Sequence, residues 1–542
     1  MTKTKHRAFI TTATACLLAG CGGGGGGGSA PGTPVAPAPP PAPPTAQTPA
    51  DPVFTERATA AGLAQSVAFD PAYTKMASRF AGGAAAGDVD GDGDDDLVLL
   101  RGSSAPVVML NAGGAFSPLQ GALTVPAGHR LSGPVLGDLD GDGDLDLFVG
   151  GLEDDGARLF AGDGTGRFAD VTAASGLAEM GARNTISAAL GDYDADGDLD
   201  LLLAHWGTAR TGADSESTET LWRNDGRLQF TDVSVASGAK TAVDATLEGK
   251  LGRGYDYTFA PNFVDINGDG VLDILMVSDF RGSRVLTGQG DGTFANTTDT
   301  TQITDTNGMG TDVADVDRDG APDWFVTSIN SNRLYGNQRG AFIDRGEASG
   351  LAAGSWGWGT CFADVNADGW LDAVQANGWH VDTGSSEAEP YSADRTRLWL
   401  GQPDGSYEDR AGEAGLDDAE QTRAVICHDF DGDTDIDVLL LVNGAQDGVI
   451  YHRNDTPGTN AVTVRLDGPL HGIGATVTAE AGGDTQTRWI RAGSTFTAQT
   501  PMAAHFGLGR DTQADITVQW PDGTEQVERG VRAGTALVLT KP

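Results

Sequence analysis

The stretch that decides the fold is GDVDGDGDDDLVLL, which runs from Gly87 to Leu100. It places six aspartates within nine residues and then turns apolar. Carboxylates this close repel one another, so the cluster indicates that another charge offsets theirs. The apolar run that follows is typical of a short buried strand. The stretch therefore predicts a cation-binding loop directly in front of a strand.

The same pattern, D-x-[DN]-x-D-[GT]-x-x-D, occurs seven times. An aspartate or asparagine occupies its first, third, fifth and ninth positions in every copy. In chain order these residues are Asp88, Asp90, Asp92 and Asp96; Asp138, Asp140, Asp142 and Asp146; Asp192, Asp194, Asp196 and Asp200; Asp265, Asn267, Asp269 and Asp273; Asp315, Asp317, Asp319 and Asp323; Asp364, Asn366, Asp368 and Asp372; and Asp429, Asp431, Asp433 and Asp437.

This spacing suits a hard cation. Oxygens at the first, third and fifth positions converge when the loop curls, and the later carboxylate closes the shell. Calcium accepts about six to eight oxygens, whereas magnesium demands tighter geometry and is the weaker candidate. Zinc is disfavoured because the loops hold no cysteine or histidine. We therefore expect up to seven structural Ca²⁺ ions. Solvated acidic turns are the alternative, which seven copies in front of seven strands disfavour.

Two features set particular loops apart. Asn267 and Asn366 replace an aspartate, which loses a charge but keeps an oxygen. In the last loop, Thr434 occupies the sixth position, where glycine permits the sharp turn. We therefore expect a strained turn or a half-formed site in the last loop.

The copies begin 49 to 73 residues apart, a period typical of propeller blades. Each unit reads as four strands, but the seventh lacks its last strand. FTERATAAGL, which begins at Phe54, is a strand of that kind and precedes the first loop. We therefore predict an all-β fold: a seven-bladed β-propeller over residues 54–457 in which the N-terminal strand closes the last blade. Residues 459–542 are predicted to form a small C-terminal β domain, because TVQW-PDGT-EQVERG is typical of a hairpin.

The N-terminus carries an export signal. A basic start and an apolar run over residues 8–18, too short to span a bilayer, predict a signal peptide over residues 1–20. LAGC, from Leu18 to Cys21, resembles a bacterial lipobox, in which Cys21 is lipidated; the alternative is an ordinary signal peptide with an incidental cysteine. Through the same resemblance, Gly22 after the cysteine points to an outer-membrane lipoprotein that faces the periplasm or the cell surface.

Composition and net charge limit the classes of partner that we expect for this chain. Residues 21–53 are rich in glycine and proline and are predicted to be a disordered tether. The chain has 35 Lys+Arg, 76 Asp+Glu and a formal net charge of −41, which excludes non-specific nucleic-acid binding. Membrane contact is therefore expected only through the lipid anchor. Cys361 and Cys427 either pair in the oxidising compartment or remain as two buried free thiols.

Candidate ligand-binding residues come from two long insertions and from SWGWG. By strand order the insertions lie on the face opposite the Asp loops. Loops on a rigid scaffold are common binding sites, so we hypothesise a glycan- or protein-binding rim. The alternative is that these aromatics pack between blades. The candidates are His205, Trp206, Trp356, Trp358, Trp379 and His380, with Tyr255, Tyr257 and Tyr391 beside them.

Catalytic motifs are missing from the sequence. It holds no HExxH and no G-x-S-x-G, and its glycine-rich GDGTGR and GIGATV open no helix of a βαβ unit. We therefore expect no enzyme. The expected function is an adhesion or interaction scaffold. A carbohydrate-binding protein is the alternative, and a polysaccharide-active enzyme is less favoured.

Several motifs resemble known families. The Asp loops resemble the FG-GAP/VCBS repeats of integrin α-chain propellers, where such loops bind calcium. SWGWG and NGWH, from Ser355 and Asn377, resemble the bacterial relatives of cartilage acidic protein, although Trp379 interrupts the NGH that this family often shows. GIGATV, RWIRAGS, HFGLG and VQWPDGTEQ, between Gly472 and Gln526, resemble an ASPIC/UnbV domain. The resemblance implies a non-enzymatic, calcium-binding extracytoplasmic protein and names no ligand.

Overall fold

The structure is a computed structural model that describes residues 50–65, 80–209, 219–240, 255–379, 391, 394–442, 448–493 and 495–542. All of these residues belong to one compact unit, Ala46–Pro542. The predicted signal peptide, Cys21, most of the predicted tether and His380 lie outside the described residues. Within the described ranges, no helix has both the length and the apolar composition that a membrane crossing requires.

Strands dominate the described chain, and the all-β prediction is confirmed. Up to Asn454 they form seven consecutive groups, and in each group an Asp loop joins the first strand to the second. The groups are β2 (Gly83–Gly87), β3 (Asp96–Arg101), β4 (Ser104–Leu110) and β5 (Ser117–Pro118); β6 (Leu131–Gly137), β7 (Asp146–Gly151), β8 (Arg158–Gly162) and β9 (Phe168–Asp170); β10 (Thr185–Gly191), β11 (Asp200–Ala209), β12 (Glu219–Asn224) and β13 (Phe230–Asp232); β14 (Tyr255–Val264), β15 (Asp273–Ser278), β16 (Arg284–Gly288) and β17 (Phe294–Asn296); β18 (Gly308–Ala314), β19 (Asp323–Asn330), β20 (Arg333–Gln338) and β21 (Ala341–Asp344); β22 (Ser355–Ala363), β23 (Asp372–Asn377), β24 (Arg397–Gly401) and β25 (Tyr407–Asp409); and β26 (Thr422–His428), β27 (Asp437–Val442) and β28 (Val449–Asn454).

The strands after each Asp loop are buried on both faces. β7, with the sequence DLFVGG, and β15, with DILMVS, are buried along their whole length. A strand covered on both sides reads as a continuous apolar run rather than an alternating one. This explains why the chain turns apolar immediately after each acidic cluster.

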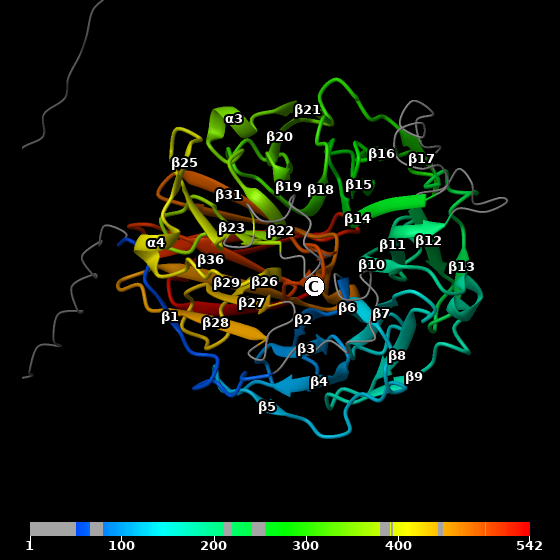
Figure 1. The fold of residues 1–542 in the computed structure, drawn as a ribbon. Coiled ribbons are helices and arrows are strands. Elements are labelled where there is room, and N and C mark those ends of the chain that lie inside the picture. The colour runs from blue at the N-terminus through cyan, green and yellow to red at the C-terminus, as the bar shows by residue number, and fades with distance from the viewer. Residues whose placement is uncertain are drawn as a thin grey trace, which may run out of the picture. The chain divides into compact units, whose positions relative to one another are not determined.

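The strand groups follow one another around a common centre (Figure 1). The first strand of each group contacts the first strand of the next, and β26 of the seventh group contacts β2 of the first. The N-terminal strand β1 (Phe54–Glu56) pairs antiparallel with β28, with Phe54 opposite Asn454. The two ends of this part of the chain therefore meet in one sheet.

The C-terminal residues add two small sheets. One has the order β34-β29-β37 and the other the order β31-β30-β35-β36. The hairpin predicted at PDGT joins β35 to β36. The strands are β29 (Ala461–Asp467), β30 (Thr476–Ala481), β31 (Asp484–Trp489), β34 (Ala503–Gly507), β35 (Gln513–Gln519), β36 (Glu525–Arg532) and β37 (Thr535–Thr540).

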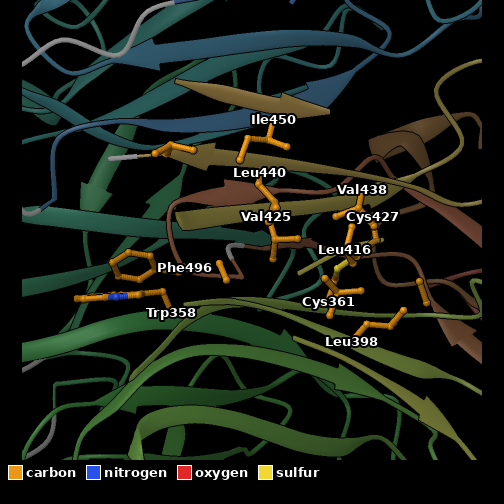
Figure 2. Packing of buried hydrophobic residues seen from close by; sticks show 14 of the residues in the cluster. Trp358, Cys361, Leu398, Leu416, Val425, Cys427, Val438, Leu440, Ile450 and Phe496 are labelled. Carbon is orange, nitrogen blue, oxygen red and sulfur yellow. A yellow bond between two sulfur atoms is a disulfide. The ribbon is translucent and has the colours of Figure 1, made fainter. Parts of the chain in front are cut away.

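One segment of the C-terminal region reaches the centre of the strand groups. Its short strands β32 (Ala492–Gly493) and β33 (Ala498–Gln499) pair with β10 and β2. Between them, the Phe496 ring lies 5.1 Å from that of Trp358 and 5.6 Å from that of Phe259, centroid to centroid. Figure 2 shows Phe496 beside Trp358 in this core. The segment therefore packs against first strands from several groups at once.

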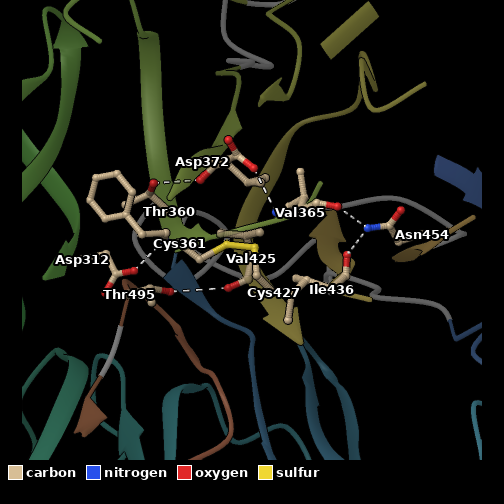
Figure 3. Close-up of a disulfide and its surroundings, with 12 residues drawn as sticks. Asp312, Thr360, Cys361, Val365, Asp372, Val425, Cys427, Ile436, Asn454 and Thr495 are labelled. Carbon is tan, nitrogen blue, oxygen red and sulfur yellow. Dashed lines mark hydrogen bonds between the residues drawn. A yellow bond between two sulfur atoms is a disulfide. The ribbon is translucent and has the colours of Figure 1, made fainter. Parts of the chain in front are cut away.

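Cys361 and Cys427 form a disulfide, which settles the alternative that the sequence left open. Their Cα atoms lie 6.2 Å apart, within the range that a disulfide spans. The bond joins β22 to β26 (Figure 3). It therefore links the sixth strand group to the seventh, which is the group whose strand β28 pairs with β1.

Candidate metal-binding loops

Each Asp loop curls around the side chain of its first residue. In the first loop, Asp88 Oδ1 accepts the backbone N–H of Gly91 at 2.8 Å and Oδ2 accepts that of Gly93 at 3.0 Å. In the last loop, Asp429 accepts the equivalent N–H groups of Gly432 and Thr434, both at 2.8 Å. The first aspartate therefore holds the turn through hydrogen bonds from the loop backbone.

The fourth and sixth positions of each loop are left-handed. Glycines hold most of them, as Gly91 does at φ 76° and Gly93 at φ 99°. Ala195, Arg318 and Ala367 take the fourth position at φ between 53° and 60°, and Thr434 takes the sixth at φ 72°. The sequence predicted the requirement at the sixth position but missed the one at the fourth. The last loop is fully curled, so Thr434 bears the strain without leaving the loop half-formed.

The ninth-position aspartate ties the loop to the third strand. Asp96 is fully buried; its Oδ2 accepts the N–H of Val89 at 3.0 Å and its Oδ1 that of Asn111 at 2.8 Å. The same pair of contacts recurs in all seven loops, to the second residue of the loop and to the third strand. The closing residues of the other six loops are Asp146, Asp200, Asp273, Asp323, Asp372 and Asp437.

Three carboxylates converge in five of the loops. Their first, third and ninth residues each bring one oxygen within 4.8 Å of the others. The two other loops hold Asn267 or Asn366 at the third position. The fifth-position aspartates, although predicted as ligands, belong to none of these groups. The convergent residues are Asp88, Asp90 and Asp96; Asp138, Asp140 and Asp146; Asp192, Asp194 and Asp200; Asp315, Asp317 and Asp323; and Asp429, Asp431 and Asp437.

The convergent oxygens suit a hard cation. At the third position, Oδ1 of Asp90, Asp194 and Asp431 is buried and has no hydrogen-bond donor among the described residues. In the fifth loop, Oδ1 of both Asp315 and Asp317 is in the same situation. A buried carboxylate oxygen without a donor is costly. A cation with oxygen preference, such as Ca²⁺, would offset that cost at this place.

The pKa values of the ninth-position aspartates also favour a bound cation. Burial, with a further contribution from neighbouring carboxylates, raises the pKa of Asp96 and of Asp146 to about 7. The same causes raise the pKa of Asp200 to about 9. Without a cation these sites therefore hold on to protons near neutral pH, and a bound divalent ion would compete with them.

The fifth loop carries its own counter-charge. The Arg345 guanidinium forms an ion pair with Asp317, the third-position residue. Arg318, at the fourth position, stacks over the ring of Trp370 in the sixth loop, 3.7 Å from its centroid. An arginine beside a carboxylate competes with a cation for the same oxygens, which the sequence pattern alone did not indicate.

The predicted aromatic rim requires correction. His205 is fully buried, its Nδ1 lies 3.2 Å from Thr185 Oγ1, and burial lowers its pKa to about 3. Trp358 is 1% exposed and Trp379 7%. These three side chains lie in the core and offer no surface to a ligand. His380 lies outside the described residues.

The remaining rim candidates pack against that core. Trp206 and Trp356 are partly buried beside it, and so is Tyr391. The rings of Trp356 and Trp379 stack 4.8 Å apart, and Trp206 stacks on Phe259 at 5.6 Å. The aromatic motif SWGWG is thus a packing element, which is the alternative weighed from the sequence. The side chain of Tyr255 lies outside the described part of the structure.

Family models match two parts of the chain. The FG-GAP-like repeat matches residues 88–149, 138–203, 265–326 and 315–374, and ASPIC and UnbV matches residues 467–542. The chain is 33% identical to human cartilage acidic protein 1 over 113 residues, which are 20% of this chain and 17% of that protein. The predicted FG-GAP repeats and ASPIC/UnbV domain are confirmed. The chain thus matches about a sixth of the length of its curated relative.

Two solved structures are distantly similar to this chain. One is an Agrocybe aegerita lectin that recognises non-reducing terminal N-acetylglucosamine, with a TM-score of 0.40, 18% identity and coverage of 75% of this chain and 94% of that one. Another is the extracellular domain of a hybrid two-component system from B. thetaiotaomicron, with a TM-score of 0.38, 9% identity and coverage of 91% and 60%. Neither likeness assigns a ligand to this chain.

Proposed function

We propose that this chain, which carries FG-GAP-like repeats and an ASPIC/UnbV domain, is a calcium-binding, lipid-anchored scaffold of the cell envelope that binds a partner outside the cytoplasm. The observation that carries the calcium assignment is the convergence of carboxylates around buried oxygens without donors. Five of the seven loops place three carboxylate oxygens within 4.8 Å of one another.

The architecture that we propose is a closed seven-bladed propeller. Three observations support closure: β1 pairs with β28, β26 contacts β2, and the side chain of Asn111 donates to the carbonyl of Phe430 across 319 residues. Each of them joins the first strand group, or the strand before it, to the seventh. In such a ring calcium has a structural role, because it offsets the repulsion among the carboxylates of each Asp loop.

The anchor and the absence of catalysis are part of the same proposal. The lipobox at Cys21 and the tether at residues 21–53 support attachment to the outer membrane. No catalytic motif supports an enzyme, whereas a rigid ring with loops at both faces suits binding. A protein partner and a carbohydrate are both compatible with this scaffold, and a polysaccharide-active enzyme is less favoured.

Thermal unfolding of residues 46–542, which form one compact unit, tests the proposal. We expect several calcium ions per chain by mass spectrometry and a large fall in melting temperature with EDTA, because ligands that bind only the folded state stabilise it. An unchanged melt with no bound metal would reduce the loops to acidic turns.

The lipid anchor is tested separately. We expect radiolabelled palmitate to be incorporated at Cys21 and to be lost in the Cys21→Ser variant.

A further inference from the structure

A cleft lies between the Asp loops and the ASPIC/UnbV domain. Its volume is about 800 Å³, within the range of about 300 to 1,000 Å³ typical of ligand pockets. One wall is formed by the loops of the third, fourth and fifth strand groups. The other is formed by Leu470, Ile473, Gly474, Thr476, Trp489 to Arg491, Gln519 to Gly523 and Lys541. Neither domain forms this cleft without the other.

Contacts between the two domains hold these walls in register. Arg491 donates to Asn262 Oδ1 at 2.8 Å and to Asp312 Oδ1 at 2.7 Å, which ties the ASPIC/UnbV wall to the fourth and fifth groups. β32 pairs with β10 of the third group. The strands that carry the loops of one wall are therefore fixed to the opposite wall, and the cleft is preorganised.

The cleft has both apolar and polar lining. Trp489 and Tyr193 contribute aromatic surface, and Ile473 and Pro521 contribute aliphatic surface. Trp489 is half-buried and lines the cleft. A lining of this kind suits a ligand with apolar faces and polar edges rather than a purely apolar one.

The charges in the cleft exclude a polyanion. Six aspartates and three basic residues line it. Lys541 forms an ion pair with Asp522 at 2.8 Å, and Arg491 is engaged with Asp312. Arg339 is exposed and forms no ion pair with the described residues, and Gln519 is an exposed residue of the same lining. Apart from that of Asp522, the exposed carboxylates outside the convergent groups are therefore those of Asp196 and Asp319, and Arg339 and Gln519 are the exposed donors.

We propose that this cleft binds a neutral oligosaccharide. The apolar C–H face of a sugar ring would lie on Trp489. Its hydroxyl groups would donate to the exposed carboxylates of Asp196 and Asp319, and its oxygens would accept from Arg339 and Gln519. The inference rests on the proposed function and deepens it, since it names the ligand class and makes the ASPIC/UnbV domain half of the binding site. It also moves the site from the predicted aromatic rim to the face that carries the Asp loops.

The test is a glycan array of neutral, acidic and amino-sugar oligosaccharides, probed with residues 46–542 in calcium, followed by calorimetry on the strongest neutral ligand. We expect Trp489→Ala to weaken binding at least tenfold, and Arg339→Ala and Gln519→Ala each severalfold. Trp356→Ala is the matched control, because Trp356 is a half-buried tryptophan outside both the cleft and the Asp loops. Its affinity should stay within twofold of the unmodified chain.

Arg339 and Gln519 are exposed, so their variants keep the test valid if Trp489→Ala does not fold. An array without neutral ligands, or binding that survives both Trp489→Ala and Arg339→Ala, would overturn the inference. Binding of basic peptides alone would overturn it in favour of a protein partner. If calcium content and the EDTA melt are as expected while no sugar binds, this inference fails and the proposed scaffold stands. If no calcium binds, the proposed function itself fails.

Discussion

The side-chain amide of Asn111 donates a hydrogen bond to the backbone carbonyl of Phe430, 2.8 Å away and 319 residues further along the chain. Its Nδ2 also donates to the carbonyl of Asp95 at 3.1 Å. Asn224, Asn337 and Asn454 repeat this pattern, each bonding to the Asp loop of the preceding group. Among these four, Asn111 is the one that joins the first group to the seventh.

Replacing Asn111 with alanine should therefore destabilise the protein. The change leaves two buried carbonyls without a donor, which typically costs about 1 to 3 kcal/mol. We expect a lower urea midpoint and melting temperature in calcium. Asn296→Ala is the control, because Asn296 is exposed at the end of β17 and its side chain accepts only local hydrogen bonds among the described residues, from Thr298. Equal stability of the Asn111 variant and the unmodified chain would contradict a closing role for this contact.

Asp194→Asn should have opposite effects with and without calcium. Asp194 Oδ1 is buried without a donor, beside Asp192 and Asp200. Removing its charge relieves repulsion in the metal-free protein, so we expect a higher melting temperature in EDTA. In calcium we expect a lower melting temperature than the unmodified chain and about one ion fewer per chain by mass spectrometry. Asp154→Asn, at an exposed aspartate outside the loops, should change neither value; a uniform shift in both buffers would argue against a metal site.

The metal-free protein should lose stability as the pH rises. Burial raises the folded-state pKa of Asp96, Asp146 and Asp323 to about 7, against an ordinary value of 3.8. Between these values the folded state binds more protons than the unfolded state, so the free energy of unfolding falls with increasing pH. We expect the melting temperature in EDTA to fall between about pH 4.5 and about pH 7.5, a range that covers most of the interval between the unfolded-state and folded-state pKa values. In calcium the fall should be much smaller, and an EDTA melt that rises over this range would contradict the assignment.

The Asp loops were predictable because their contacts are local. Asp88 bonds to Gly91 and Gly93, and Asp96 bonds back to Val89, all within one short segment of chain. Spacing alone therefore indicated which side chains converge. The exception is the fifth position, which spacing placed among the ligands and which the structure leaves outside the convergent groups.

Contacts between distant segments were not predictable in this way. Phe496 packs on Trp358 and Phe259, and Arg345 pairs with Asp317 from another part of its group. The aromatics of SWGWG looked like a binding surface because nothing local showed that a C-terminal segment would cover them. Burial of this kind depends on the assembled fold and not on any period in the sequence.

Arg345→Gln should strengthen calcium binding by the fifth loop. The Arg345 guanidinium pairs with Oδ2 of Asp317, while Oδ1 of the same carboxylate has no donor among the described residues. Without this competing cation, the loop keeps its carboxylates and loses an internal counter-charge. In a calorimetric titration with calcium, we expect the weakest site of the chain to bind severalfold more tightly in the variant. In EDTA we expect the variant to have a lower melting temperature. The matched control is Arg227→Gln, an exposed arginine outside the loops. Unchanged affinity at every site would show that Arg345 and a cation do not compete.

Thr434→Gly should stabilise the last loop. Thr434 holds φ 72°, a conformation that costs a non-glycine residue about 1 to 2 kcal/mol. Glycine removes this strain but loses about 0.5 to 1 kcal/mol of chain entropy on folding, so we expect a net gain of roughly 0.5 to 1 kcal/mol. The contacts of Thr434 to Asp429 and His505 use its backbone N–H and carbonyl, so glycine keeps both.

Thr434→Ala is the matched control, because it shortens the side chain but retains the Cβ and its strain. Urea unfolding in calcium should rank the glycine variant above both the alanine variant and the unmodified chain; equal stability of the glycine and alanine variants would show that the strain at this turn is negligible.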